Sequence, residues 1–406
     1  MQCRHHGTAA VCGLVTAFVA LSAFVTLGHN PRSAQPNHGA AQHELLHTGD
    51  ARAHVLGSAA FGNSSPGAVT VSEYLSSGST INAFVFAGRR RYMRVLWPYL
   101  LRDRRSASGG TGVLSQVIFA ANTDDADDLA FLSDLEASYP DYVRVIHPPR
   151  VVHQGTNNGD YCSIYGGVTE LLGDQDNGAG RQLMLKLDDD IVYIAPGALR
   201  ALAAAKLRHP ELLFVSANVV NHPLLAHVHQ RLMLLSQTEV AAMVEAETAS
   251  GNADVSTLPE KWIFGYATFD HDNWQSPPHA LLQHMMLLHR LRTLGENGTV
   301  AAYGGFRAWD FDAQGYGTAR WSINAFAYWP DTDLELMDLD ACGRLDDEEY
   351  LTRVLPEVVG RHSIATGDAL VAHFAYYPQR KGLEEDTHLL ARYQALADAV
   401  AAQTSP

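Results

Sequence analysis

The sequence has little cysteine and few basic residues for its length. Only 4 of its 406 residues are cysteines, and they form no CxxC pair and no zinc-binding pattern. Cys3 and Cys12 lie in or before an apolar N-terminal segment, so the rest of the chain can form at most one disulfide, between Cys162 and Cys342. The net charge is −15 at pH 7. Because phosphate backbones are bound by basic surfaces, this charge argues against nucleic acid as the main partner.

Charged residues are also missing from the run between Ala9 and Leu27, which is close to the roughly 20 apolar residues that span a bilayer. Arg4 precedes this run, so the tail at 1–8 would stay in the cytosol and the remainder would be translocated. A cleaved signal peptide is the alternative, because the run is rich in Ala. We expect an uncleaved anchor at 9–28. Either reading places the residues after about His29 in the secretory lumen or outside the cell.

The composition changes along the chain. From about residue 29 to residue 78 the sequence is rich in Ser, Gly, Ala, Asn, Pro and His without apolar periodicity, which indicates a flexible stem. The remainder, 79–406, is long enough for one large domain or two small ones, and 47% of the whole sequence is hydrophobic. No internal repeat is found.

Strand and helix patterns alternate after the stem. Strand patterns lie at Ile81–Ala87, Val113–Ala121, Val143–Ile146, Leu183–Ile194 and Leu212–Ala217, and helix patterns at 90–103, 126–138, 163–172 and 196–208. This alternation predicts an α/β fold with a mostly parallel, doubly wound sheet and helices on both faces. The second half is less regular, with expected helices at 278–294 and 384–402 and a strand-like run at 320–329.

Three consecutive carboxylates, Asp188, Asp189 and Asp190, interrupt the apolar run from Leu183 to Ile194. Such a run reads as a buried parallel strand, and the carboxyl end of such a strand is where α/β proteins hold ligands. The carboxylates repel one another unless a cation shares them, and oxygen ligands suit Mg²⁺ or Mn²⁺, which bridge phosphates. The alternative is a solvated acidic loop, because Asp is common in turns.

Four segments carry a resemblance to a known family: KLDDDIVYI, SANVVNHP, LDDEEYLT and ALVAHF, in this order behind the anchor and the stem. From about Ser79 to Tyr393 the chain resembles Golgi-type glycosyltransferases of the GT-A fold, in particular a fungal-type or algal-type eukaryotic set. The resemblance implies a nucleotide-binding half at 79–220 and an acceptor-binding half at 221–406. It also implies a single-pass type II protein of the Golgi or ER membrane with a luminal catalytic domain. The expected substrates are a nucleotide-diphosphate sugar as donor and a glycan, protein or lipid as acceptor.

The resemblance implies a metal site. Asp188 and Asp190 match the Asp-x-Asp motif that holds Mn²⁺ or Mg²⁺ against the diphosphate in this family. Asp190 is the better candidate for direct ligation, and Asp188 for the ribose or a metal-bound water. His373, in VAHF, resembles the C-terminal His that completes the metal shell in several members. A buried structural imidazole is the alternative for His373, although imidazole is an acceptable Mn²⁺ ligand.

The segment LDDEEYLT resembles the motif that places a carboxylate beneath the acceptor in inverting members. A base there would accept a proton from a sugar hydroxyl as the anomeric carbon is attacked. Asp347 is the first choice, with Asp346 and Glu348 as alternatives. If these residues only stabilise a helix N-terminus, as acidic first turns do, a retaining mechanism becomes admissible.

Residues near two strand ends are expected to contact the nucleotide. Gly88 and Arg89 to Arg91 follow the first strand, where this fold grips the nucleotide, so one Arg can meet the diphosphate while the others are solvated. Lys186 points into the site or only pairs with a carboxylate. The full set of expected nucleotide contacts is Gly88, Arg89, Arg91, Lys186, Asp188 and Asp189.

The expected acceptor contacts lie in the second half. Asn218, Asn221 and His222 follow the fifth expected strand and are candidates to line the sugar or acceptor pocket. Trp321 is a candidate to stack on a sugar face. The ordinary roles of such residues are turn formation in loops and packing in a core.

Two other functions remain open on the sequence. Phosphohydrolases of the haloacid dehalogenase type also end a strand in Asp-x-Asp and bind Mg²⁺, but their nucleophile sits on the first strand of the domain. Here three strand and helix units precede Asp188. The other alternative is a catalytically silent binding module that keeps the GT-A-like fold.

Overall fold

The computed structural model describes the chain over residues 69–106, 110–148, 161–173, 180–233, 237–249, 274–311 and 320–404. The expected anchor at 9–28 and most of the expected stem lie outside these residues. Within them, no helix is both long and apolar enough to cross a membrane.

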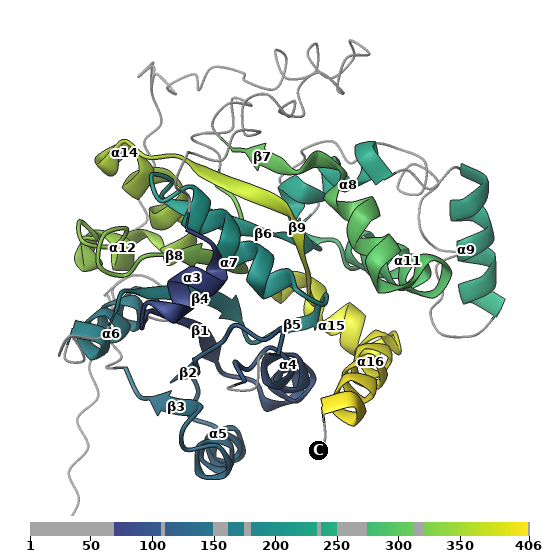
Figure 1. The fold of residues 1–406 in the computed structure, drawn as a ribbon. Helices are drawn as coiled ribbons and strands as arrows, with labels where there is room; N and C mark the ends of the chain where they lie inside the picture. The colour runs from purple at the N-terminus through teal and green to yellow at the C-terminus, as the bar shows by residue number, and fades with distance from the viewer. Residues whose placement is uncertain are drawn as a thin grey trace, which may run out of the picture. The chain divides into compact units, whose positions relative to one another are not determined.

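Strands and helices alternate over most of the described chain (Figure 1). The strands are β1 (Thr80–Ala87), β2 (Gln116–Ala121), β3 (Val143–Ile146), β4 (Gln182–Asp188), β5 (Ile191–Ile194), β6 (Phe214–Val220), β7 (Ala308–Asp310), β8 (Ala325–Tyr328) and β9 (Ser363–His373). The helices are α3 (Val71–Ser76), α4 (Arg90–Arg102), α5 (Ala126–Ser138), α6 (Tyr161–Gly173), α7 (Ala198–Arg208), α8 (Pro223–Met233), α9 (Gln237–Ala249), α11 (Pro277–Tyr303), α12 (Leu339–Leu345), α13 (Asp347–Glu349), α14 (Leu355–Val359), α15 (Tyr377–Glu385) and α16 (Leu389–Thr404). A 3-10 turn, η2 (Gly304–Phe306), and a π-helical turn, η4 (Tyr350–Val354), complete the set.

The described strands form one sheet in the order β3-β2-β1-β4-β8-β6-β9-β5, and β7 pairs with β9. Strands β3, β2, β1 and β4 are parallel neighbours, and β6 is parallel to β9. Strand β8 runs antiparallel to both β4 and β6, between which it lies. The prediction of a mostly parallel α/β sheet is therefore confirmed, with an antiparallel strand from the second half of the chain at its centre.

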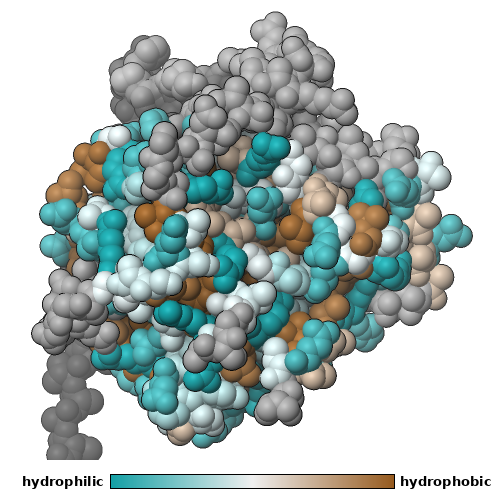
Figure 2. All heavy atoms as spheres, viewed as in Figure 1, coloured by the Kyte–Doolittle hydropathy of each residue, from teal (hydrophilic) through white to brown (hydrophobic). Residues whose placement is uncertain are grey.

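Both faces of the central strands are covered. Every residue of β6 is buried, and so is every residue of β1 after Thr80. Because successive side chains of a strand point to opposite faces, burial of all of them requires cover on both faces. Helix α7 packs on β6 and β9, and α4 packs with α16 beside β5 (Figure 1). On the face shown in Figure 2, hydrophilic and hydrophobic residues of the described chain are interspersed.

The Asp-bearing run is divided into two strands. Asp188 is the last residue of β4, Asp189 and Asp190 form a turn, and β5 begins at Ile191. Strand β4 pairs with β1 and β8, whereas β5 pairs antiparallel with β9, where Ile191 is opposite His373. The turn thus carries the chain from one part of the sheet to another, and the carboxylates lie where it changes partners.

The ordered domain begins earlier than expected. Helix α3 lies inside the range that the composition indicates as stem, and Val71 and Tyr74 on it are buried. Its start is fixed by a capping box, in which the Thr70 side chain accepts from the Glu73 backbone and the Glu73 side chain accepts from the Thr70 backbone. This local signal, T-x-x-E, was available in the sequence.

Other expected boundaries also differ, for example α11, which runs to Tyr303 and not to residue 294. Helix α7 begins at Ala198 and not at Pro196, because Gly197, with φ of 76°, precedes it in the left-handed region. The expected final helix at 384–402 is the end of α15 followed by α16, with a break between Glu385 and Leu389.

Several histidines are buried in the core without charge. His284, on α11, donates from Nε2 to the carbonyl of Phe374 at 2.9 Å and accepts at Nδ1 from the hydroxyl of Tyr393 at 2.7 Å. Burial lowers its pKa to about 3. Burial likewise lowers the pKa of His222 and of His229 to about 3 and the pKa of His279 to about 4. The folded state therefore excludes protons that these residues would bind when unfolded.

Acidification is expected to destabilise the protein through these histidines. A folded pKa below the unfolded value of about 6.5 means that stability is present above pH 6.5 and is lost as the pH falls. At pH 5 the loss is about 2 kcal/mol for each histidine. His284→Gln should be less stable than the wild type at pH 7.5, but the gap should narrow at pH 5. Urea unfolding at pH 5, 6 and 7.5 measures this, with the exposed His388→Gln as control; an unchanged gap would contradict it.

Candidate active site

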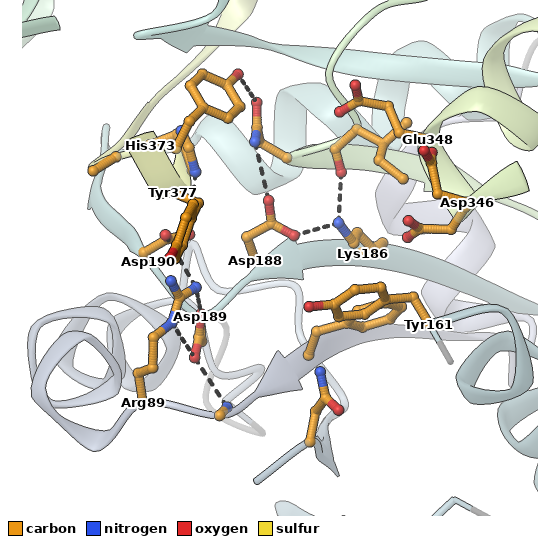
Figure 3. Close-up of a pocket in the computed structure, with 18 of the residues that line it drawn as sticks. Arg89, Tyr161, Lys186, Asp188, Asp189, Asp190, Asp346, Glu348, His373 and Tyr377 are labelled. Carbon is orange, nitrogen blue, oxygen red and sulfur yellow. Dashed lines mark hydrogen bonds and ion pairs between the residues drawn. The ribbon is translucent and has the colours of Figure 1, made fainter. Parts of the chain in front are cut away.

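A cleft of about 870 Å³ lies where β1, β2 and β4 end (Figure 3). Gly88 and Arg89 follow β1, Asn122 follows β2, and Asp188 closes β4. Because these strands are parallel, their carboxyl ends meet at one edge of the sheet, which is the usual ligand position in such folds. The opposite wall comes from the second half of the chain, namely Asn324, Asp346 to Glu348, His373 and the start of α15.

Asp189, the middle residue of the triplet, holds the turn after β1. Its carboxylate accepts from the backbone N–H of Gly88 at 2.9 Å and from Nε of Arg89 at 3.0 Å. The side chain is buried, and burial raises its pKa although Arg89 opposes this. The carboxylate oxygens of Asp189 are therefore hydrogen-bonded within the protein, and the expected contact of Asp189 with a nucleotide stays a prediction.

Asp188, Asp190 and His373 come together on one side of the cleft. One oxygen or nitrogen atom from each lies within 4.8 Å of those from the other two. The pairing of β5 with β9 places His373 opposite Ile191, so that its Nε2 lies 3.2 Å from Oδ1 of Asp190. We refer to these three residues as the metal-type trio.

The trio fits a divalent metal of the Mn²⁺ type. Two carboxylates and one imidazole form a mixed oxygen and nitrogen set, which suits Mn²⁺. His373 is buried, and its Nδ1 has no hydrogen-bond partner among the described residues. Three protein ligands leave positions open for water and for phosphate oxygens.

Protein cations already lie beside the trio. Arg89 Nη2 is 3.0 Å from Oδ2 of Asp190. Burial raises the pKa of Asp190, but Arg89 and His373 outweigh it, so the pKa falls below its ordinary value and the carboxylate stays ionised.

Asp188 is held by neighbours from both halves of the chain. It pairs with Lys186, and Asn324 Nδ2 donates to its Oδ2 at 3.0 Å. Tyr376 in turn donates to Asn324 at 3.0 Å. Lys186 lines the cleft but is buried, and it also donates to the Ile323 carbonyl. Both readings of Lys186 from the sequence, a cleft residue and a carboxylate partner, describe its position.

The three candidate bases have different surroundings. Asp346 caps α13, because its Oδ1 accepts from the backbone N–H of Glu349 at 2.7 Å. Arg320 pairs with Asp346 at 3.0 Å and with Glu348 at 2.6 Å. Asp346 and Glu348 are therefore both engaged by the protein.

Asp347 lines the cleft between these two residues, and its carboxylate has no hydrogen bond or ion pair among the described residues. Its low-dielectric surroundings raise its pKa to about 7, against the effect of Lys186 and with the help of Glu348 and Asp346. A carboxylate with a pKa near the working pH and no fixed donor is suited to accept a proton. The alternative considered for this acidic segment, stabilisation of a helix N-terminus, applies to Asp346, which caps α13.

Arg91 and the expected acceptor residues are not among the side chains that line this cleft. Arg91 turns outward and pairs with Glu384 at 2.8 Å, over the ring of Tyr92. Trp321 is buried and stacks on Phe311, with the ring centroids 4.7 Å apart. The geometry supports a packing role for Trp321.

Asn218, Asn221 and His222 are also buried and bind backbone groups. Asn218 donates to the Gly367 carbonyl at 2.9 Å, and Asn221 donates to the Phe374 carbonyl at 3.0 Å. Nδ1 of His222 accepts from the first turn of α8. These positions do not support contacts with an acceptor substrate, because the polar side-chain atoms of the three residues are hydrogen-bonded to backbone groups of the protein.

Other cleft residues were missed by the sequence interpretation. Tyr161 stacks on Phe86 with an interplanar angle of 7° and lines the cleft, as Asn122 does. Arg320, Asn324 and Arg380 also line it. Asn122 directly follows a strand pattern, so its place at a strand end could have been predicted from the sequence. The sequence around the other residues gives no indication that they line a cleft.

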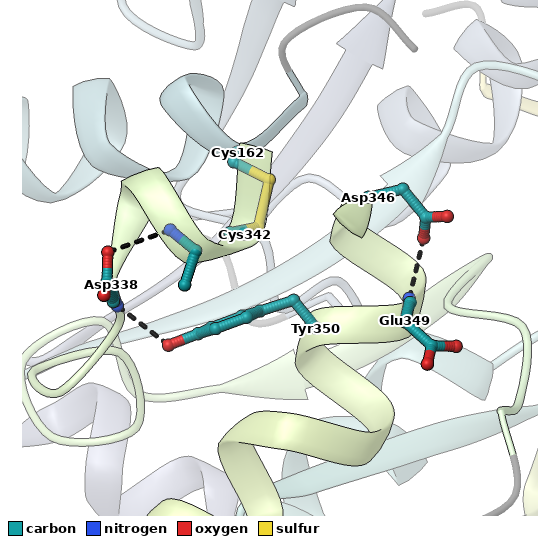
Figure 4. Close-up of a disulfide and its surroundings, with 7 residues drawn as sticks. Cys162, Asp338, Cys342, Asp346, Glu349 and Tyr350 are labelled. Carbon is teal, nitrogen blue, oxygen red and sulfur yellow. Dashed lines mark hydrogen bonds between the residues drawn. A yellow bond between two sulfur atoms is a disulfide. The ribbon is translucent and has the colours of Figure 1, made fainter. Parts of the chain in front are cut away.

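A disulfide ties the wall of the cleft together. Cys162 on α6 is bonded to Cys342 on α12, 180 residues later in the sequence (Figure 4). Tyr161 precedes the first cysteine, and Asp346 follows the second by one turn. The bond therefore fixes Tyr161, an aromatic of the cleft, relative to the acidic segment at Asp346 to Glu348.

Removing this bond with Cys162→Ala and Cys342→Ala is expected to lower the free energy of unfolding by about 3 to 5 kcal/mol, because it closes a long loop. Thermal unfolding with and without reductant measures the effect. Reductant should destabilise the wild type to the level of the double variant and leave the double variant unchanged. A wild type insensitive to reductant under conditions that free both thiols would contradict this.

No known protein family and no curated protein sequence matches the chain. One solved structure with similarity is described as the structure of CMP:2-keto-3-deoxy-manno-octonic acid synthetase complexed with CTP, at 12% sequence identity and a TM-score of 0.33. The match covers 79% of this chain and 98% of that chain. A likeness this distant carries no function, which has to come from the cleft itself.

Proposed function

We propose that the chain is a metal-dependent glycosyltransferase of the GT-A type that moves a sugar from a nucleotide-diphosphate sugar to an acceptor hydroxyl with inversion. One observation carries this proposal: a single cleft holds the metal-type trio and, separately, Asp347, a carboxylate without a partner among the described residues and with a pKa of about 7. The first group suits a diphosphate leaving group, and the second suits a hydroxyl that has to lose a proton.

The trio would hold the divalent ion, with Asp190 and His373 as direct ligands and Asp188 oriented by Lys186 and Asn324. A bound Mn²⁺ or Mg²⁺ supplies charge neutralisation to the departing diphosphate. Arg89 keeps Asp190 ionised and Asp189 in place. These residues therefore orient the donor before any bond changes.

In the proposed reaction the acceptor oxygen attacks the anomeric carbon from the face opposite the diphosphate. The new carbon–oxygen bond forms as the bond to the phosphate oxygen breaks, and the nucleoside diphosphate leaves with the electron pair. Asp347 takes the hydroxyl proton. Arg320 holds Asp346 and Glu348, so that Asp347 between them is left free to do so.

The geometry does not favour the phosphohydrolase alternative. A nucleophilic Asp has to reach the substrate phosphorus, whereas Asp188 lies on the fourth strand of the described residues and is held by Lys186 and Asn324. A silent binding module remains the other candidate, and it differs by having no turnover.

The Golgi or ER location and the membrane anchor also remain proposals. The Cys162–Cys342 disulfide supports them, because such bonds persist in oxidising compartments such as the secretory lumen.

A donor screen tests the function. The full chain is incubated with a panel of nucleotide sugars, with Mn²⁺ or with chelator, and release of the nucleoside diphosphate is measured. We expect release with at least one sugar nucleotide, dependent on the metal and increased by a suitable acceptor. Binding without release would favour the silent module, and phosphate release from simple phosphomonoesters would favour the phosphohydrolase.

A further inference from the structure

The charged side chains of the cleft are almost all paired with one another. In the described part of the chain, six carboxylates and four cationic side chains line the cleft. Arg89 pairs with Asp189 and Asp190. Lys186 pairs with Asp188, and Arg320 with Asp346 and Glu348. Among these lining residues, one carboxylate and one cation are left, Asp347 and Arg380.

Arg380 lies on α15 and reaches the cleft from the side of the metal-type trio. Its charge acts on Asp190, yet it forms no ion pair with a carboxylate of the described residues. Its Nε is buried and has no hydrogen-bond acceptor there. A buried guanidinium nitrogen without an acceptor is costly, so an anion from outside the protein is the expected partner.

A second feature fixes the position of Arg380. Its Cζ lies 5.9 Å from the ring centroid of Tyr377, the first residue of α15. Tyr377 is 83% exposed and lines the same cleft as Arg89 and Asp190 (Figure 3). Arg380 is therefore near the exposed Tyr377 ring, and its charge acts on the ionised Asp190, so an oxygen-rich ligand in the cleft can meet its donors.

We propose that Arg380 is the phosphate-binding residue of the cleft and that its guanidinium binds the diphosphate of the donor beside the trio. This inference rests on the proposed function and names the part of the donor that this side chain recognises. The planar fork of donors matches phosphate oxygens, which Lys would meet only as a point charge. The two unpaired charges then have separate tasks, Arg380 at the leaving group and Asp347 at the acceptor hydroxyl.

Calorimetric titration of the full chain with inorganic pyrophosphate in the presence of Mn²⁺ tests the inference. Arg380→Gln is expected to weaken pyrophosphate binding about ten-fold or more, because charge-assisted hydrogen bonds are lost. Arg380→Lys should keep part of the affinity. Lys381→Gln is the matched control, since it removes the same charge from the neighbouring, exposed position of α15 and should bind as the wild type does. Mn²⁺ binding without pyrophosphate, followed by electron paramagnetic resonance, should be unchanged in all variants.

The inference is wrong if the wild type does not bind pyrophosphate or if Arg380→Gln binds it equally well. It is also wrong if Arg380→Gln loses Mn²⁺ itself, because the effect would then arise from the trio. Failure of the proposed function looks different: pyrophosphate binding would depend on Arg380 while no sugar nucleotide is turned over. In the opposite case, metal-dependent transfer at the wild-type rate by Arg380→Gln would leave the function standing and remove Arg380 from it.

Discussion

Asp347→Asn is expected to lower turnover by roughly 10²-fold or more, because positioned proton transfer typically contributes 10²- to 10⁴-fold. Donor and metal binding should stay near wild type, since Asp347 makes no ion pair or hydrogen bond with the described residues that line the metal side. Steady-state kinetics with a saturating donor, together with nucleoside diphosphate binding, separates the two effects.

The same variant should change the pH profile. With a pKa of about 7, Asp347 is half ionised near neutrality, so kcat/KM of the wild type should rise with pH up to about 7 and then level off. Asp347→Asn should lose this acid limb. Glu349→Gln is the matched control in the same segment, because Glu349 pairs with Arg353 at 2.6 Å and does not line the cleft. Full turnover by Asp347→Asn, with loss in Glu348→Gln, would move the base to Glu348.

The pKa of Asp347 also has a consequence for stability. Because its folded pKa of about 7 lies above the unfolded value, the folded state binds more protons between about pH 4 and pH 7. Stability from this group is therefore lost as the pH rises through that window. At pH 8 Asp347→Asn should be more stable than the wild type by roughly 1 to 2 kcal/mol, allowing for its partial exposure. A variant that is inactive but more stable cannot owe its inactivity to unfolding.

The second large effect is expected from Asp190→Asn. Loss of one carboxylate from the trio should lower metal-dependent turnover by at least about 100-fold and weaken Mn²⁺ binding. Mn²⁺ titration of activity and calorimetry of Mn²⁺ binding measure the two losses. Asp127→Asn, at a surface ion pair with Arg90, serves as the control for removing one negative charge.

Asp190→Asn should still fold, because the amide can accept from Arg89 as the carboxylate does. Circular dichroism and unfolding measurements should show a native state with a modest loss of stability. Wild-type turnover with unchanged Mn²⁺ dependence in Asp190→Asn would remove Asp190 from the metal site.

Much of the first half of the fold was predictable, because its strands are marked by short apolar runs. Strand β3 and helix α5 occupy the expected residues, and β1 differs by one residue. The position of β8 between β4 and β6 was not predictable. Pairing between strands far apart in sequence depends on side-chain packing across the sheet, for which the local pattern holds no information.

The site shows the same division. The Asp triplet was visible because carboxylates in an apolar run are out of place. Pairing of Lys186 with a carboxylate was one of its two expected roles, but the ion pairs of Arg89 with Asp189 and Asp190 were not foreseen. The sequence argument took three adjacent carboxylates to need a metal, whereas protein cations already compensate much of that repulsion. Arg380 was missed for a similar reason, since a cation reaching in from a late helix has no local signal.

Loop polarity was a poor guide to the acceptor side. Asn218 and Asn221 follow the expected strand at Leu212–Ala217, which is typical of binding loops. In the structure Asn218 lies within β6 and Asn221 directly after it, and their amides donate to backbone carbonyls of α11, β9 and the residue after β9. Asn221 even adopts a positive φ of 63° while buried. Such residues satisfy buried backbone groups, and a sequence does not distinguish that role from ligand contact.

The place of β8 in the sheet has a consequence for biosynthesis. Strands β1 to β4 leave the ribosome early, but the neighbour of β4 on the far side is β8, which begins at Ala325. Until β8 has been synthesised, one edge of β4 stays unpaired. Strand β6 also has no neighbouring strand until β8 and β9 have been synthesised. Half of the sheet therefore has to persist with an open edge over much of synthesis, which favours wrong pairing and slow folding. Cys162 likewise cannot form its native bond until Cys342, 180 residues later, has been synthesised, so the disulfide closes only after most of the chain is made.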